Sequence, residues 1–193
     1  MGRLRDSGLS AGMKVVYWTG SGLAPPWIMG SSDFTGSGSV TQAETLDQLI
    51  DGAEAAVRRT LEYLEGPGAT STARIDRWGV WEISAHLLHW HRVTAEAAQA
   101  AARGETPVRF TSPVDDINEE VVAKAAGMSL QQIVTELNQV HETMIRAIRD
   151  LPDPDVVLMH RPDGSSPSAK DRLRTIAHHW TEHLEELLAV AGA

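Results

Sequence analysis

The sequence contains no cysteine among its 193 residues. This absence excludes three kinds of chemistry: disulfide cross-linking, metal binding through thiolates, and nucleophilic catalysis by a cysteine side chain. Any reaction that uses sulfur would therefore need a thiol supplied from outside the chain.

Basic residues are also scarce, since 17 Lys and Arg stand against 26 Asp and Glu and give a formal net charge of −9. A surface with this charge repels phosphate backbones and anionic lipids. No apolar run approaches the roughly 18 to 20 residues that a membrane-spanning helix needs. We expect a soluble, cytoplasmic protein that binds a small molecule, with neither nucleic acid nor a membrane as a partner.

Glycine and serine recur throughout residues 1–40, and Pro25 and Pro26 interrupt the one apolar patch there. This stretch has no helical period, and its apolar run is too short for a secretory signal peptide. We predict a flexible, Gly/Ser-rich N-terminal segment over residues 1–40. Residues 41–193 are predicted to form one folded domain, because a chain of this length suits a single hydrophobic core.

From residue 41 onward, apolar residues recur every three or four positions, which is the period of an amphipathic helix. Capping residues begin these segments and Gly or Pro ends them; Thr41 and Glu44, for example, have the spacing of a capping box. Long helices are predicted over residues 41–65, 78–102, 130–151 and 169–190. A short helix over residues 114–126 lies in the connection between the second and third, so the predicted fold class is all-α, a four-helix bundle with a short extra helix.

Two of the eight histidines fall on one side of the last predicted helix. A helix turns by 100° per residue, so His179 and His183 point in similar directions, toward the apolar side that carries Trp180. Two imidazoles one turn apart can bind the same metal ion. Because eight histidines make such a pair easy to find by chance, an alternative stays open, in which both side chains are hydrogen-bonded to neighbours at the helix edge.

His86 supplies a third imidazole, from the edge of the apolar face of helix 78–102. Three neutral imidazoles leave coordination positions open, which is typical of metal sites that bind water or a substrate. Zinc, nickel and ferrous iron are all suited to imidazole ligands. His86, His179 and His183 are therefore candidate ligands of one divalent metal ion.

His141 lies within the apolar arc of helix 130–151 and is the candidate for a catalytic acid or base. The alternatives are a fourth metal ligand, or a core histidine with one hydrogen-bonded nitrogen. Arg161, Arg172 and Arg174 are candidates for holding an anionic group of a substrate. They are equally consistent with ordinary surface charge.

Two segments resemble DinB-like proteins. Trp78 precedes His86 by eight positions and Trp90 follows it by four, which resembles the second-helix signature of that family. Residues 176–184 resemble its last-helix His-x-x-x-His segment, and the similarity covers residues 41–191. The superfamily includes mycothiol-dependent maleylpyruvate isomerase and bacillithiol transferases. The resemblance implies a bundle fold and assigns the metal-binding triad to His86, His179 and His183.

The resemblance also implies a metal-dependent enzyme that acts on a small molecule by thiol transfer, thiol-dependent isomerisation or hydrolysis. Mycothiol or bacillithiol would be the thiol cofactor, loops 104–128 and 152–168 would cover the opening of the site, and the chain would form a homodimer, as family members often do. Two other hypotheses stay open. One is a non-catalytic metal- or ligand-binding stress or resistance protein, and the other is a structural bundle that dimerises through its helices.

Overall fold

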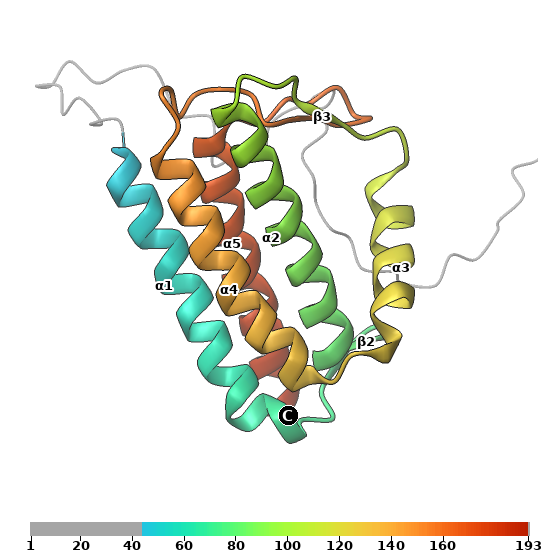
Figure 1. Ribbon diagram of the computed structural model, residues 1–193. Helices are drawn as coiled ribbons and strands as arrows, with labels where there is room; N and C mark the ends of the chain where they lie inside the picture. Colours follow the sequence, from blue (N-terminus) through green and yellow to red (C-terminus); the bar gives the residue numbers. More distant parts are fainter. Residues whose placement is uncertain (1–43, 193) are drawn as a thin grey trace, which may run out of the picture. The chain divides into compact units, whose positions relative to one another are not determined.

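The computed structural model describes residues 44–192, so the segment predicted over residues 1–40 lies outside the described part of the chain. The described part confirms the predicted all-α fold class, with four long helices and one short helix (Figure 1). Two short 3-10 turns, Pro67–Thr70 and Ala125–Gly127, follow α1 and α3. The helices are α1 (Leu46–Glu65), α2 (Val80–Ala102), α3 (Val114–Lys124), α4 (Leu130–Arg149) and α5 (Ala169–Ala191).

Hydroxyl side chains begin three of the long helices. Thr45, Ser129 and Ser168 each accept a hydrogen bond, through the side-chain oxygen, from the backbone N–H three residues later. The side chain at that later position accepts a hydrogen bond from the backbone N–H of the cap residue. These capping boxes satisfy N–H groups that a helix start otherwise leaves unpaired. The first helix therefore begins after Thr45, which forms its capping box with Gln48. The prediction that Thr41 caps this helix is wrong, because the capping-box spacing that starts the helix lies four residues later.

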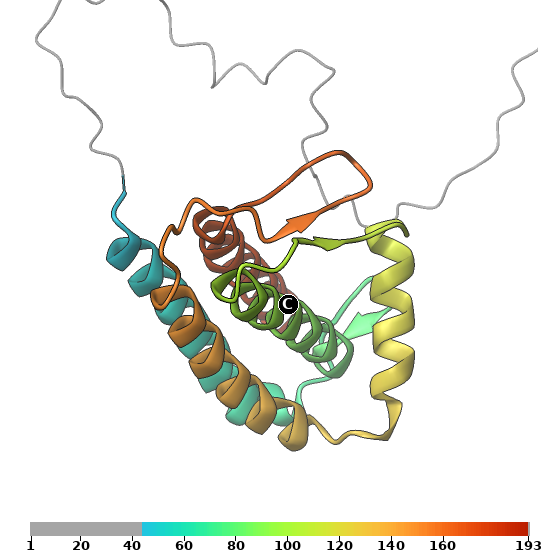
Figure 2. The ribbon, with the colours of Figure 1, turned by 45° about the horizontal axis from the view of Figure 1, so that its top comes forward.

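The directions of the four long helices require a crossover connection (Figure 1). Helices α1 and α5 run in one direction and pack side by side, while α2 and α4 run in the opposite direction and also pack side by side. Because α2 and α4 are consecutive long helices with the same direction, the chain must return between them. The connection that contains α3 makes this return, along the outer side of α2 (Figure 2).

The inward faces of the four long helices form one continuous apolar core. The periodicity of the sequence predicts these faces, because residues three and four apart lie on the same side of a helix. In the described residues, no helix has both the length and the apolar character that crossing a bilayer requires. The largest wholly buried side chains are Ile50, Leu64, Leu87, Leu88, Ile133, Leu137, Met144, Ile148, Leu158, Met159, Leu173 and Trp180.

Four two-residue strands were not predicted from the sequence. β1 (Arg74–Ile75) pairs antiparallel with β2 (Trp78–Gly79), and β3 (Val108–Arg109) pairs in parallel with β4 (Met159–His160). Such short pairs have no alternating pattern to reveal them, since they depend on loops meeting in space. The second pair joins the connection after α2 to the loop between α4 and α5 (Figure 2).

Candidate metal centre

The candidate ligands come from two antiparallel helices. His86 lies in the second turn of α2, His179 lies at the middle of α5, and His183 lies one turn further toward the end of α5. Because these helices run in opposite directions, the start of α2 and the end of α5 are at the same end of the bundle (Figure 1). The fold thus brings His86 together with two histidines that follow it by more than ninety positions in the sequence.

The three imidazole rings converge through their Nε2 atoms. The Nε2 atom of His179 lies 3.1 Å from Nε2 of His86 and 2.7 Å from Nε2 of His183. One ligand atom from each ring lies within 4.8 Å of both others. The structure therefore brings together the three residues that the sequence predicts as metal ligands.

All three imidazoles are held in their neutral form. Burial, followed by the charge of His183, lowers the pKa of His86 to about 3. Burial and the neighbouring histidines lower the pKa of His179 well below its usual value. Burial also lowers the pKa of His183, against a smaller opposing effect of Glu186. Neutral imidazole is the form that binds a metal ion, so these rings need not lose a proton at neutral pH to do so.

Asn118 of α3 determines which nitrogen of His86 carries the proton. The Oδ1 atom of Asn118 lies 2.9 Å from Nε1 of Trp90 and 3.0 Å from Nδ1 of His86. An indole nitrogen can only donate, so the atom that it faces must be the amide oxygen, which can only accept. His86 must therefore donate from Nδ1. Its Nε2 atom is left with a free electron pair that points at the other two histidines.

Glu186 has the same effect on His183. Its Oε2 atom lies 3.2 Å from Nδ1 of His183, on the next turn of α5. A carboxylate accepts a hydrogen bond, so Nδ1 of His183 donates and Nε2 carries the electron pair. The Nε2 atom of His179 then faces the electron pairs of His86 and His183. A single proton on that nitrogen cannot make a full hydrogen bond to both.

This donor set fits a divalent metal ion. Zinc–imidazole bonds of about 2.0–2.1 Å in a tetrahedral arrangement place ligand nitrogens roughly 3.3 Å apart. The observed Nε2 separations of 3.1 Å and 2.7 Å are shorter than that value, and all three ligand atoms lie within 4.8 Å of one another. Hydrogen bonds to the far nitrogen of a ligating histidine are the usual support of such sites, and here Asn118 and Glu186 supply them. Three ligands would leave at least one coordination position open.

An aromatic side chain packs against His86. The ring of Trp78 lies 5.4 Å from the His86 ring between centroids, and Phe110 lies 5.6 Å from Trp90. In segment 104–128, Asn118 contacts His86 and Phe110 contacts Trp90. The expectation that loops 104–128 and 152–168 cover the opening of the site stays a prediction. Loop 152–168 contacts the same segment, because its backbone oxygens accept hydrogen bonds from the N–H groups of Val108 and Phe110.

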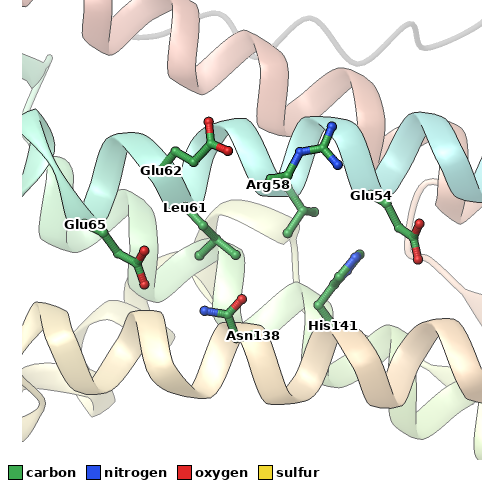
Figure 3. Close-up of a pocket in the computed structure, with 8 residues that line it drawn as sticks. Glu54, Arg58, Leu61, Glu62, Glu65, Asn138 and His141 are labelled. Atoms are coloured by element: carbon green, nitrogen blue, oxygen red, sulfur yellow. The ribbon is translucent and has the colours of Figure 1, made fainter.

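His141 lies in a different contact network. Its Nδ1 atom is 3.3 Å from Nε2 of His91 on α2, and no described contact joins it to the three-histidine cluster. It also borders a groove of about 340 Å³ between α1 and α4, toward which it points (Figure 3). Its predicted catalytic role stays a prediction. The groove is lined by Glu54, Val57, Arg58, Leu61, Glu62, Glu65, Asn138 and His141.

Two of the three arginines proposed for anion binding, Arg172 and Arg174, have different surroundings. Arg172 is only 2% exposed and donates from Nε and Nη2 to Oγ1 of Thr94, both over 3.2 Å. Arg174 is on the surface and pairs with Glu44 and Asp171. Arg172 is therefore buried, and the interpretation of these arginines as ordinary surface charge does not apply to it.

Sequence reasoning missed the residues that support the ligands. Asn118 and Glu186 were given no role, and His91, which the helical period places at the border of the apolar face, is wholly buried beside Trp180. Glu186 follows His183 by three positions, a spacing that could have identified it. No sequence signal connects Asn118 to His86, because the contact arises only when α3 packs on α2.

Comparison with known families agrees with this arrangement. The sequence pattern of the DinB superfamily matches residues 49–187, which include all three histidines of the cluster. Searches among curated proteins and among solved structures give no significant match. The family match spans α1 to the last turns of α5 and covers well over half of the chain. The chain therefore belongs to the DinB superfamily.

Proposed function

We propose that this protein is a metal-dependent enzyme that acts on a small molecule at the site formed by His86, His179 and His183. The reaction would be thiol transfer, thiol-dependent isomerisation or hydrolysis. A divalent ion of zinc, nickel or iron would lower the pKa of a bound water or thiol, or polarise a carbonyl group. Because the chain has no cysteine, a thiol reaction would use an external thiol such as mycothiol or bacillithiol.

One observation carries this proposal: the electron pairs of His86 and His183 are fixed toward the Nε2 atom of His179. A purely structural cluster would alternate donors and acceptors so that each buried nitrogen is satisfied. Here two acceptors face one ring nitrogen inside the protein. A cation at their centre would use all three electron pairs at once.

The alternative function is metal or ligand binding without turnover. The described polar contacts of the cluster come from Asn118 and Glu186, and both hold ligands in place. An enzyme that moves protons would also need a group free to exchange them, and His141 contacts His91 instead. This observation favours a binding protein, so the test must measure metal content and turnover separately. A homodimer and a cytoplasmic location stay predictions.

The first measurement is the metal content of untagged protein, purified without added metal and analysed by mass spectrometry. We expect about one transition-metal ion per chain, and a loss of at least roughly tenfold in metal affinity on His86→Ala. The matched control is His178→Ala, which removes an exposed histidine next to the ligands on the same helix and should leave the metal content unchanged.

The second measurement is turnover, with mycothiol or bacillithiol and a panel of electrophiles, and products detected by mass spectrometry. An enzyme should form products with wild type and His178→Ala but not with His86→Ala. Full metal content without turnover would favour the binding protein. If wild-type chains carry no transition metal, or if His86→Ala changes nothing, both metal functions are wrong.

A further inference from the structure

Helix α3 has an unusual means of attachment. Its single buried residue is Asn118, which is 8% exposed, although α3 has eleven residues. A short helix on a protein surface is normally held by a buried apolar stripe, since isolated helices of this length are marginal in water. The apolar side chains of α3 are only half-buried: Val114, Ile117, Val121 and Val122.

The polar anchor of α3 meets the metal site directly. The Oδ1 atom of Asn118 accepts hydrogen bonds from His86 and Trp90, which lie one turn apart on α2. Both partners are also buried, at 3% and 7% exposure. A buried carbonyl oxygen without these bonds would cost about 1–3 kcal/mol. The position of α3 on α2 is therefore tied to one particular state of the His86 ring.

The other described polar contacts of α3 and its C-terminal connection do not involve the three histidines. Arg77 and Glu119 form an ion pair, but both side chains are largely exposed, and such pairs contribute little. Beyond the C-terminal end of α3, Trp81 donates to the backbone oxygen of Met128 at 2.9 Å. Val122 adds a half-buried apolar contact with the core. Asn118 is thus the one fully buried side chain that anchors α3, which lies beside α2 (Figure 2).

We propose that Asn118 is a positioning residue of the metal centre, and that metal binding and the docking of α3 stabilise each other. This inference rests on the proposed metal site. Docked α3 requires His86 to donate from Nδ1, and a metal ion requires a free electron pair on Nε2; both select the same tautomer and ring orientation. Two events that favour one state are coupled, and the coupling is reciprocal.

The first test uses the full wild-type chain and zinc. Hydrogen exchange of backbone amides, followed by mass spectrometry, is compared with and without one equivalent of Zn²⁺. We expect zinc to slow exchange in residues 114–124 by about fivefold or more, because opening of α3 would then require loss of the optimal His86 geometry. Unchanged exchange there, with zinc bound, would overturn the proposal.

The second test uses variants of Asn118. Asn118→Ala removes the acceptor, and we expect zinc affinity to fall about 10- to 100-fold, with loss of the zinc effect on α3. Asn118→Asp keeps an acceptor oxygen for both partners and should restore most of the affinity. The matched control is Asn138→Ala on α4, whose side chain bonds only locally, to the backbone oxygen of Val134, and should behave as wild type.

The results separate the two proposals. If wild type binds zinc tightly and Asn118→Ala binds it equally well, the metal site stands and the coupling to α3 is wrong. If wild type binds no zinc, both are wrong. Should Asn118→Ala fail to fold, the exchange experiment on wild type and the affinity of Asn118→Asp still decide the matter, since weak binding by Asn118→Asp also contradicts the proposal.

Discussion

An imidazole binds a metal only through a nitrogen that carries no proton, so the partner of its other nitrogen controls its function. In this protein Asn118 and Glu186 are those partners, and each forces a histidine to donate from Nδ1. The two differ in charge. Asn118 fixes orientation without adding charge, whereas the carboxylate of Glu186 also increases the electron density of the His183 ring.

This difference gives a prediction for Glu186→Gln. Glutamine can still accept the hydrogen bond of His183 but removes the negative charge, so we expect metal affinity to fall about tenfold, while the fold is retained. Competition with a chelator of known affinity measures this change. The control is Glu185→Gln, because Glu185 is exposed on the same helix. Equal affinity of Glu186→Gln and wild type would show that the carboxylate does not support the metal.

The sequence predicts the ligands better than their supports. His86, His179 and His183 could be predicted because a helix turns by a fixed angle, which relates each position to the apolar face. Asn118 could not, since its role depends on the packing of α3 against α2. The helical period places His91 only at the border of the apolar face of α2, because it describes one helix alone. Trp180 of α5 and His141 of α4 contact His91 and complete its burial.

At the scale of the elements, local signals predict the helices and fail for the strands. Ser129 and Gln132, for example, are close in sequence, so the start of α4 can be identified from neighbouring residues alone. The pairing of Val108 with Met159 joins positions that are distant in sequence and has no local pattern. The first helix shows the limit of local signals, because the observed cap, Thr45, lies four residues after the predicted cap, Thr41.

The cap of α4 provides a stability prediction. The Oγ atom of Ser129 accepts a hydrogen bond from the N–H of Gln132 at 3.2 Å, so Ser129→Ala should lower the free energy of unfolding by about 1 kcal/mol. Urea denaturation measures this loss. Thr135→Ala removes a hydroxyl from the exposed middle of the same helix and should change stability by less than about 0.5 kcal/mol. Equal effects of the two substitutions would contradict the capping role.

At the scale of the whole molecule, several ionisable groups lie inside the bundle. His91 and His141 join α2 to α4, Arg172 lies on α5, and the three-histidine cluster joins α2 to α5. Burial lowers the pKa of His141 to about 4. Burial, and then the charges of His141 and Arg172, lower the pKa of His91 well below its usual value.

These shifts make the stability of the metal-free protein depend on pH. In the unfolded chain the histidines bind protons below a pH of about 6.5, whereas in the folded chain they resist protonation, so the unfolded state is favoured as pH falls. The loss begins near pH 6.5 and continues to about pH 4 for His141. We expect the free energy of unfolding to decrease by at least about 2 kcal/mol between pH 7 and pH 5.

Urea denaturation of chelator-treated protein at several pH values checks this expectation. His178→Ala is the control, since that side chain is 79% exposed, and it should show the same loss as wild type. A flat profile between pH 7 and pH 5 would mean that the buried histidines are protonated in the folded state or are not buried.

X-ray absorption spectroscopy at the edge of the bound metal would show directly whether the three histidines share one ion. With one equivalent of Zn²⁺ on the full chain, we expect outer-shell scattering from three imidazole rings, with nitrogen ligands at about 2.0–2.1 Å. The number of rings should fall to two in His86→Ala. A spectrum with oxygen ligands alone, or one that His86→Ala leaves unchanged, would contradict the assignment of His86, His179 and His183 as a shared metal site.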